Sequence, residues 1–380
     1  MIPPFYRLCL QAVLTPSQVT TLEILVWLLQ INKQVQIEQL AARFPLPIKY
    51  ESRRKKIQRF LSLPYFTINA IWLPIIKGLI KIKVKPKERI LVAIDRTQWS
   101  NRNLFVASWI KDKRAIPLFW VLLDKKGSSN LREQKKLLAP VLKMLKKYEV
   151  IVIGDREFSS VELAKWLGEK GVYFCFRQKK NTYIKLINQD YQRLDSLDLG
   201  ASCKCYYSGI KVRKEKGFGP TNMVIYKKRK YRGKSPNEAW YLLTNLGSLQ
   251  EAITCYKARM GIEAMFKDCK TGGYNLEKSK AKEERFMSLV LLIAIAYTSA
   301  ILQGKKIKQK GLQKYICRLS ESRRLERRHS NFWVGLYGCC WMISMDYLPE
   351  LVEKLMILSR NKLRFYQKGL RAMSLIQTAF

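Results

Sequence analysis

Apolar and polar residues along this chain follow different spacings in different regions. Residues 1 to about 88 place apolar side chains three or four positions apart, which is the spacing of amphipathic helices. One of these helices is expected to start at Ser17, a residue type that caps helix N-termini. The segment 37–45 resembles the first helix of a helix-turn-helix and is ended by prolines. The first part of the chain is therefore predicted to be helical.

The segment 50–61 is a basic amphipathic stretch within this helical region. Its cations, which stand beside apolar residues at helical spacing, include Arg53, Arg54 and Arg59. A helix of this kind can dock on DNA phosphates or lie in a groove of the duplex. The same pattern also describes a basic helix face that contacts only water, so both interpretations stay open.

From residue 89 onward, short apolar runs typical of β-strands replace the helical spacing. Three such runs lie consecutively at 89–99, 103–111 and 115–124, separated by short polar breaks. A helical stretch, a buried strand run at 149–158, a short helix and a further strand at 172–178 follow. Three antiparallel strands, then helix, strand, helix and strand, is the order of a ribonuclease-H-like fold. We therefore predict a mixed α/β sheet flanked by helices.

Short strand candidates separated by glycines interrupt this pattern between residues 178 and 239, and we interpret them as a β-rich insertion. The strand that begins at Trp240 returns to the core, and the rest of the chain is helical and basic. The predicted regions are a helical DNA-binding region at 1–88, the first part of the core at 89–177, the insertion at 178–239, the second part of the core at 240–304 and a basic helical C-terminal region at 305–380.

One apolar run, 287–302, invites comparison with a membrane helix. It is shorter than the about 20 residues needed to span hydrocarbon, and it contains Ser288, Tyr297 and Thr298. We therefore expect a buried core helix and no membrane partner. The first residues lack a basic leader followed by a clean apolar stretch, so we expect no signal peptide.

The 380-residue chain is strongly basic, with 71 Lys and Arg against 29 Asp and Glu and a formal net charge of +42. Such an excess repels itself in a compact fold, so a polyanionic partner is expected, most commonly nucleic acid. An anionic membrane is a weaker alternative, because the cations are not gathered on one amphipathic helix. Nine cysteines without a C-x-x-C pair and a single histidine, His329, argue against a zinc site. The thiols suit a reducing compartment, so we expect a cytoplasmic protein associated with the nucleoid.

Two aspartates follow apolar strand runs. Asp95 comes after Leu-Val-Ala-Ile and Asp155 after Ile-Val-Ile-Gly, so each acid is expected at the exit of a buried strand. Side chains in that position emerge at the rim of a sheet, where catalytic groups usually lie. Aspartate also commonly caps the turn that follows a strand, so a purely structural role is the alternative for each residue.

A third acid lies on the helix predicted to end before Gly272. Counted from Tyr256 as position i, the residues at i+3, i+7 and i+14 are Arg259, Glu263 and Lys270. At about 100° per residue, the four positions fall near 0°, 300°, 340° and 320°, on one narrow stripe of the helix. Lys267 shares this stripe by geometry alone. The alternative is an ordinary charged helix face in which Arg259 and Glu263 form an i,i+4 pair.

These residues carry a family resemblance. The pattern Tyr-x2-Arg-x3-Glu-x6-Lys matches the signature of a large group of DDE transposases of bacterial insertion sequences. The segments around Asp95 and Asp155 resemble the first and second aspartate segments of that family, and Asp-Arg-Glu recurs in the second. The intervals between the three acids fit as well, and the longer one, from Asp155 to Glu263, leaves room for a β-rich insertion before the glutamate helix. The resemblance covers roughly residues 89–300.

The resemblance implies a metal-dependent enzyme that cuts transposon ends and joins their 3′-hydroxyls to target DNA. Three converging carboxylates suit Mg²⁺ or Mn²⁺, and two ions about 3.5–4 Å apart can support in-line displacement at phosphorus. We expect Asp95 to bridge both ions and Asp155 and Glu263 each to complete one. Alanine at any of the three acids would then abolish cleavage and leave DNA binding largely intact.

Roles in DNA binding follow from the same resemblance. Arg259, Lys270 and Tyr256 would contact phosphates of the transposon end, with Lys267 as a weaker candidate. Trp240 matches the place of a tryptophan that stacks on a flipped base in relatives, although a core or surface aromatic is the alternative. The expected partners are double-stranded DNA, as transposon ends and target, and a second copy of the chain.

Two other functions stay open at this point. One is a metal-dependent nuclease of the same fold that lacks strand transfer, which an assay supplying donor and target DNA together would distinguish. The other is a non-catalytic basic DNA-binding protein, which would show no metal-dependent nicking.

Overall fold

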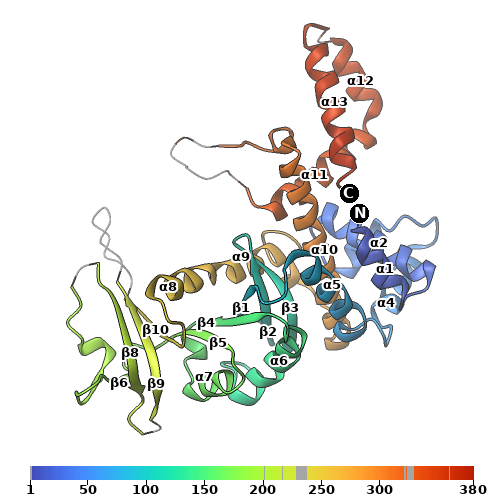
Figure 1. The fold of residues 1–380 in the computed structure, drawn as a ribbon. Helices are drawn as coiled ribbons and strands as arrows, with labels where there is room; N and C mark the ends of the chain where they lie inside the picture. Colours follow the sequence, from blue (N-terminus) through green and yellow to red (C-terminus); the bar gives the residue numbers. More distant parts are fainter. Residues whose placement is uncertain are drawn as a thin grey trace. The chain divides into compact units, whose positions relative to one another are not determined.

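The computed structural model describes residues 2–200, 202–215, 217–227, 238–320, 322, 329–358 and 360–380 (Figure 1). The chain divides into two compact units, each described here by itself. One unit joins Met1–Gly78 with Lys267–Phe380, and the other is Leu79–Phe266. The region boundaries expected from the sequence, at residues 88, 177, 239 and 304, stay predictions.

The unit Leu79–Phe266 is built on a mixed sheet. In the described residues the strand order is β3-β2-β1-β4-β5-β10-β9-β8-β6-β7. The strands of its core are β1 (Arg89–Trp99), β2 (Arg102–Lys111), β3 (Arg114–Leu122), β4 (Glu149–Gly154), β5 (Tyr173–Arg177) and β10 (Trp240–Thr244). β1 to β3 form an antiparallel meander, whereas β4 runs parallel to β1 and β5 parallel to β4. This order confirms the predicted ribonuclease-H-like core.

The β-rich segment between β5 and β10 extends the sheet. Its described strands are β6 (Tyr183–Lys185), β7 (Tyr191–Arg193), β8 (Lys204–Val212) and β9 (Phe218–Tyr226). β10 pairs antiparallel with both β5 and β9, so the insertion continues the core sheet through hydrogen bonds. The predicted β-rich insertion is confirmed over these strands, and its part at 228–237 lies outside the described residues.

Helices cover the sheet of this unit. They are α6 (Leu131–Met144), α7 (Val161–Gly168), α8 (Leu249–Ala258) and the first part of α9 (Met260–Cys269), with 3₁₀ turns at Arg156–Phe158 and Leu194–Ser196. Figure 1 shows α6 and α7 on one side of the core sheet and α8 on the other. Because both faces are covered, every residue of β4 after Glu149 is buried. α6 starts with a capping box formed by Asn130 and Glu133 and tolerates Pro140 inside.

The other unit is helical. Its N-terminal helices are α1 (Pro4–Gln11), α2 (Pro16–Asn32), α3 (Ile37–Ala42), α4 (Tyr50–Leu61), a π-helical turn (Ile68–Trp72) and α5 (Leu73–Lys83), which runs into the sheet-containing unit. The helical prediction for the first region is confirmed. The expected cap at Ser17 is wrong, because Thr15 caps α2 in a capping box with Gln18 and Pro16 occupies the first turn.

The C-terminal part of the helical unit contains 3₁₀ turns at Leu276–Lys278, Leu312–Tyr315 and Arg360–Lys362 and the helices α10 (Glu283–Gln309), α11 (Asn331–Tyr347), α12 (Pro349–Leu358) and α13 (Leu363–Gln377). In the part of the chain that is described, α10 alone is long and apolar enough to cross a membrane, and 89% of its apolar window is buried. The prediction of a buried core helix at 287–302 is therefore confirmed. Residues 323–328, expected to be helical, lie outside the described residues.

α10 and α11 approach each other closely at two glycines. A Cβ atom on Gly304 would lie 1.9 Å from the carbonyl oxygen of Asn331, and one on Gly335 would lie 1.9 Å from that of Ala300. Real carbon atoms never come this close to a carbonyl oxygen. The crossing of α10 and α11 therefore requires glycine at both positions.

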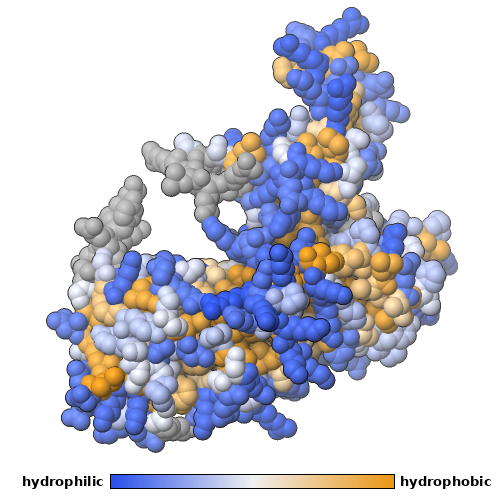
Figure 2. Space-filling view, viewed as in Figure 1, coloured by the Kyte–Doolittle hydropathy of each residue, from blue (hydrophilic) through white to orange (hydrophobic). Residues whose placement is uncertain are grey.

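α12 differs from the other helices because none of its residues is buried. Figure 2 shows apolar surface on α12 and α13. The exposed fraction is 53% at Leu351, 61% at Leu355 and 81% at Leu358. These three residues are called the α12 apolar residues below.

Candidate active site

The two predicted aspartates lie next to each other because of strand register. The parallel pairing of β1 with β4 begins with Arg89 opposite Glu149 and ends with Ala93 opposite Ile153. Asp95 lies two positions after Ala93, and Asp155 lies two positions after Ile153. The two aspartates therefore continue the same register. Neighbouring strands are about 4.8 Å apart, so the two acids emerge side by side at the carboxyl edge of the parallel pair.

The local backbone differs between the two aspartates. Asp155 directly follows β4, as predicted, and caps the 3₁₀ turn Arg156–Phe158. Asp95 lies inside β1, so its expected position at a strand exit is wrong in detail. β1 leaves β4 after Ala93 but continues against β2, where Asp95 pairs with Val106. The antiparallel hairpin therefore holds Asp95 from the side opposite Asp155.

The third acid, Glu263, lies in α9. The sequence predicted one helix from about 249 to 270, but the structure has α8 and α9 with Arg259 between them. The backbone of Arg259 stays right-handed, and i→i+3 hydrogen bonds run from its N–H to Tyr256 O (3.1 Å) and from Ile262 N–H to its own carbonyl (2.9 Å). The helical path thus tightens for one turn without reversing.

α9 is seated against the β2–β3 hairpin at Gly261. A Cβ atom on this residue would lie 3.2 Å from Ile110 Cδ1 and 3.3 Å from the carbonyl oxygen of Lys113. One turn later, the Ser108 hydroxyl lies 3.7 Å from the sulfur of Met265. Because the hairpin also carries β2 beside Asp95, this packing brings Glu263 toward the aspartates.

Arg259 bridges two of the three acids. Its Nη1 lies 3.3 Å from Asp95 Oδ2 and its Nη2 lies 2.5 Å from Glu263 Oε1, and only 13% of its side chain is exposed. The i,i+4 pair that the sequence left as an alternative is therefore present, together with the contact to Asp95. Among the residues that the structure describes, no three acidic, cysteine or histidine side chains converge closely enough to hold an ion. Arg259 supplies the positive charge between Asp95 and Glu263 in this conformation.

The site raises the pKa of Asp95 to about 7. Burial is the main cause, and the nearby negative charges of Asp155 and Glu263 add to it. A backbone hydrogen bond from Arg96 and the charge of Arg259 act in the opposite direction. A buried carboxylate among like charges is stabilised by any further cation, so the electrostatics favour binding of positive charge here.

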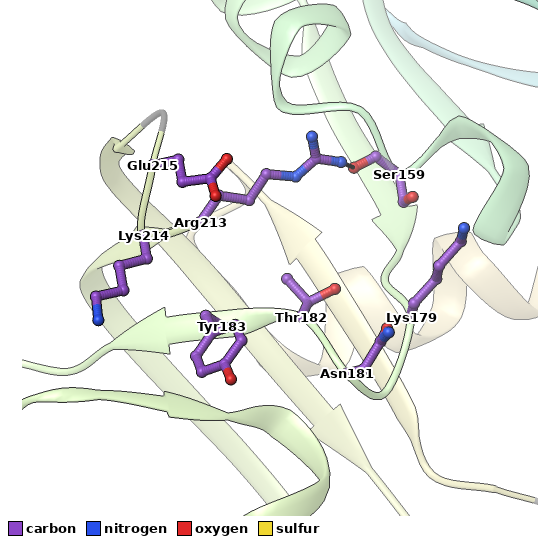
Figure 3. Close-up of a pocket in the computed structure, with 8 residues that line it drawn as sticks. All are labelled: Ser159, Lys179, Asn181, Thr182, Tyr183, Arg213, Lys214 and Glu215. Atoms are coloured by element: carbon purple, nitrogen blue, oxygen red, sulfur yellow. Dashed lines mark hydrogen bonds between the residues drawn. The ribbon is translucent and has the colours of Figure 1, made fainter.

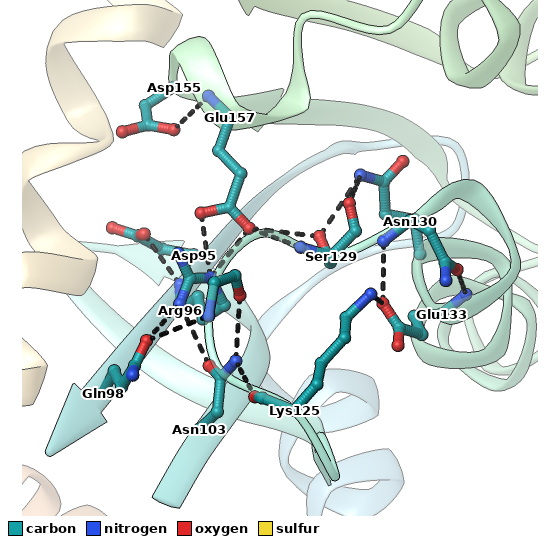
Figure 4. A network of polar contacts seen from close by, with 12 residues as sticks. Asp95, Arg96, Gln98, Asn103, Lys125, Ser129, Asn130, Glu133, Asp155 and Glu157 are labelled. Carbon is teal, nitrogen blue, oxygen red and sulfur yellow. Dashed lines mark hydrogen bonds and ion pairs between the residues drawn. The ribbon is translucent and has the colours of Figure 1, made fainter. Parts of the chain in front are cut away.

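A second ion pair, not predicted from the sequence, fixes both aspartates (Figure 4). Arg96 N–H donates to Asp95 Oδ1 (2.7 Å), and Glu157 N–H donates to Asp155 Oδ1 (2.9 Å). The side chains of the same two residues pair with each other, with Arg96 Nε 2.8 and 2.9 Å from the Glu157 oxygens. Both side chains are about 15% exposed. This Arg96–Glu157 pair therefore links β1 to the turn after β4, directly behind the two aspartates.

The Arg96–Glu157 pair is itself supported by the segment before α6. Glu157 accepts hydrogen bonds from the backbone N–H (3.0 Å) and hydroxyl (3.2 Å) of Ser129. Arg96 donates to Asn103 Oδ1 (3.2 Å), and Asn103 donates in turn to the carbonyls of Lys125 and Gly127. The Asp-Arg dipeptide that occurs after both apolar runs, and the Glu of Asp-Arg-Glu, are the sequence features from which this pair could have been found.

The aromatic residues of the predicted site pack together. The Trp240 ring lies edge-on to Tyr256, with centroids 4.9 Å apart, and edge-on to Tyr226 at 5.4 Å. Trp240 is half-buried, whereas Tyr256 is only 3% exposed. In this structure Tyr256 supports Trp240 from within the fold. A phosphate contact of Tyr256 and a base contact of Trp240 stay predictions.

The remaining predicted DNA-binding residues lie in the helical unit. Lys267 is exposed on α9, and Lys270 forms an ion pair with Glu277 at 2.6 Å. On α4, Arg59 is exposed, Arg53 is half-buried and Arg54 pairs with Glu51 at 2.8 Å. The amphipathic character of α4 is confirmed, since its apolar residues Ile57, Phe60 and Leu61 are buried. Its contact with DNA stays a prediction.

The strand order β3-β2-β1-β4-β5, two aspartates at the carboxyl edge of β1 and β4, and a glutamate from a later helix define a ribonuclease-H-like protein with a DDE arrangement of acids. Residues 120–299 match the family model described as "Transposase DDE domain". This match covers slightly less than half of the chain and confirms, for that part, the resemblance to DDE transposases seen in the sequence. The match includes Asp155 and Glu263, whereas Asp95 lies before it and is placed by strand register.

Comparison with solved structures finds a piggyBac transposase synaptic complex with hairpin DNA, at a TM-score of 0.47 and 15% identity, covering 91% of this chain and 78% of that chain. A second similarity is to Marinitoga piezophila Argonaute in complex with guide RNA and target DNA, at a TM-score of 0.23 and 11% identity, covering 58% and 33%. A comparison with curated proteins finds no match.

Proposed function

We propose that this chain is a cut-and-paste DNA transposase that hydrolyses phosphodiester bonds at transposon ends and joins the 3′-hydroxyls to target DNA. The observation that carries the proposal is the juxtaposition of Asp95 and Asp155 through strand register, with Glu263 joined to Asp95 through Arg259. The match to the transposase DDE domain supports it.

The donor set fits hard divalent cations. Asp95, Asp155 and Glu263 offer carboxylate oxygens, the ligand type that Mg²⁺ and Mn²⁺ prefer. Asp95, Asp155 and Glu263 are the residues that would hold these ions. Bound there, the ions would activate water and stabilise the leaving oxygen. Burial and the nearby charges of Asp155 and Glu263 raise the pKa of Asp95, and bound cations would stabilise its ionised form.

The protein's own contribution is to hold the acids rigidly. Asp95 and Asp155 are fixed by the β1–β4 register and by backbone hydrogen bonds from Arg96 and Glu157. Small displacements of reacting groups lower rates steeply, so this rigidity is part of the proposed mechanism. Arg259 would release the acids when ions bind. Its guanidinium would then be available to a DNA phosphate, as would Lys267, whereas Lys270 would have to exchange its ion pair with Glu277 for a phosphate.

Two partners complete the proposal. Double-stranded DNA suits the net charge of +42. A transposase must hold two DNA ends, so we propose a homodimer in the DNA complex. The α12 apolar residues are candidates for a contact between copies because their exposed apolar area is unusual for a soluble monomer. The cytoplasmic, nucleoid-associated location expected from the sequence is also part of the proposal.

The test uses the full chain and a duplex carrying the DNA that borders its reading frame. Asp155→Asn and Glu263→Gln are compared with Glu169→Gln, an exposed acid of the same unit. We expect the two site variants to lose more than about 100-fold in Mg²⁺-dependent cleavage, with DNA affinity in EDTA unchanged. Cleavage by Asp155→Asn at the rate of the unchanged protein would overturn the proposal.

Strand transfer separates the transposase from a nuclease of the same fold. Donor and target duplexes are supplied together, and joined products are measured on a denaturing gel. Cleavage without joining would assign a nuclease, and DNA binding without any metal-dependent nicking would assign a non-catalytic DNA-binding protein.

A further inference from the structure

A pocket of about 480 Å³ lies where the β-rich insertion meets the core of the sheet-containing unit (Figure 3). This volume is within the range of about 300–1,000 Å³ typical of ligand sites. Its walls come from the end of the Asp155 segment, the loop after β5, strand β6 and the turn after β8. The lining residues are Ser159, Lys179, Asn181, Thr182, Tyr183, Arg213, Lys214 and Glu215.

The pocket is close to the acids along the chain. Asp155 caps the start of the 3₁₀ turn Arg156–Phe158, and Ser159 caps its end. At a rise of about 2.0 Å per residue, the turn carries the backbone about 8 Å from Asp155 to Ser159. Successive phosphates of a DNA strand advance about 3.4 Å along the duplex axis, so the pocket is within a few nucleotides of the proposed cleavage site.

The charge of the pocket is positive, with three cations and one acid among its lining residues. Arg213 is anchored, because its Nη2 donates to the carbonyl of Ser159 at 3.4 Å and its Nη1 lies 4.0 Å from Glu162. Lys179 and Lys214 have no ion pair within the described part of the chain. Their charges are therefore available to a ligand, beside the neutral polar side chains of Asn181 and Thr182.

We propose that this pocket binds the phosphodiester backbone of a DNA strand next to the cleavage site. Lys179 and Lys214 would contact phosphate oxygens, and Arg213 would hold the pocket wall to the core. Such contacts position a strand without reading its sequence. The site gives the insertion a specific task, which is to hold DNA in line with Asp155. This inference rests on the proposed function, since it requires DNA at the acids.

The experiment compares Lys179→Gln/Lys214→Gln with Lys143→Gln/Lys146→Gln in the full chain. The control lysines are exposed around the end of α6, just before β4 starts at the edge of the sheet opposite the acids. Binding of the end duplex in EDTA is measured between 50 and 200 mM salt. Loss of two phosphate contacts lowers the slope of log affinity against log salt by about 1.8. Affinity of the unchanged protein should therefore fall about tenfold more over this range than that of the pocket variant.

A second measurement locates the contact on the DNA. Neutral methylphosphonates are placed singly at each phosphate within a few nucleotides of the cut. At one or two positions they should weaken binding of the unchanged protein and of the control variant, but not of the pocket variant. A pocket variant with the same salt slope and the same methylphosphonate profile as the control would overturn the inference. If the unchanged protein does not cleave the duplex at all, the proposed function fails instead, which is a separate result.

Discussion

Replacing Asp95 with asparagine should stabilise the metal-free protein at neutral and alkaline pH. The pKa of this carboxyl is raised from 3.8 to about 7, so its ionised form is disfavoured in the fold. At about 1.4 kcal/mol per pKa unit, the shift corresponds to an upper limit of about 4 kcal/mol. Asparagine also removes the charged partner of Arg259 Nη1, which costs about 1.5–3 kcal/mol. We expect a net gain of about 1–3 kcal/mol at pH 8.

The effect of Asp95→Asn on the free energy of unfolding should depend on pH. The folded protein holds the Asp95 proton more tightly than the unfolded chain does, so the stabilisation is complete below pH 4. It is lost as the pH rises through about 7. The side chain introduced by Asp95→Asn does not titrate, so the variant should not lose this stability as the pH rises. The advantage of the variant should therefore be smaller at pH 5 than at pH 8, where it should reach its full size.

The assay is urea unfolding in EDTA at pH 5 and pH 8, followed through the transition of the unit Leu79–Phe266. Asp190→Asn, which removes an exposed acid from the turn between β6 and β7, is the control for loss of a negative charge. Mg²⁺ should stabilise the unchanged protein at pH 8 and should stabilise Asp95→Asn much less. If Asp95→Asn were less stable than the unchanged protein at pH 8 in EDTA, Arg259 would already neutralise the site, and the argument from burial would be refuted.

Three further predictions concern other parts of the chain. Glu157→Gln should lower the cleavage rate more than about tenfold with little change in DNA affinity, because the Arg96 side chain loses its charged partner behind the aspartates; unchanged cleavage would show that the pair has no positioning role. Trp240→Ala should reduce any hairpin product, by removing about 1–3 kcal/mol of base stacking, and normal hairpin yield would remove the base-stacking role. Gly304→Ala and Gly335→Ala should each lower the stability of the helical unit by about 3 kcal/mol or more, measured as the free energy of unfolding, and a loss below about 1 kcal/mol would contradict the close helix crossing.

The strands of the core were predictable because their apolar runs are local. Each run from β1 to β5 is short and bounded by polar or glycine residues, so its existence follows from neighbouring positions alone. The placement of Asp95 next to Asp155 was also predictable from the sequence. The runs that start at Arg89 and Glu149 are parallel neighbours, and each acid follows the start of its own run by the same interval, so the two acids reach equal depth in the sheet.

Features that depend on distant contacts were not predictable. The Arg96–Glu157 ion pair joins β1 to the turn after β4 through side-chain geometry, which the spacing of apolar residues does not indicate. The insertion was recognised as β-rich, but its continuation of the core sheet depends on β10 pairing with both β5 and β9. The tightening of the backbone at Arg259 could not be predicted from the sequence either, because the apolar residues on both sides of Arg259 follow ordinary helical spacing.

The three acids are therefore held by different means, and this difference locates the weakest part of the site. Asp95 and Asp155 belong to one sheet, where register and backbone hydrogen bonds fix them together. Glu263 depends on the seating of α9 against the β2–β3 hairpin, which in turn depends on the small size of Gly261. Arg259 compensates for this looser attachment because it joins Glu263 to Asp95 through charge. If bound cations were to take the place of Arg259 between the acids, the packing of α9 around Gly261 would still align Glu263 with the sheet.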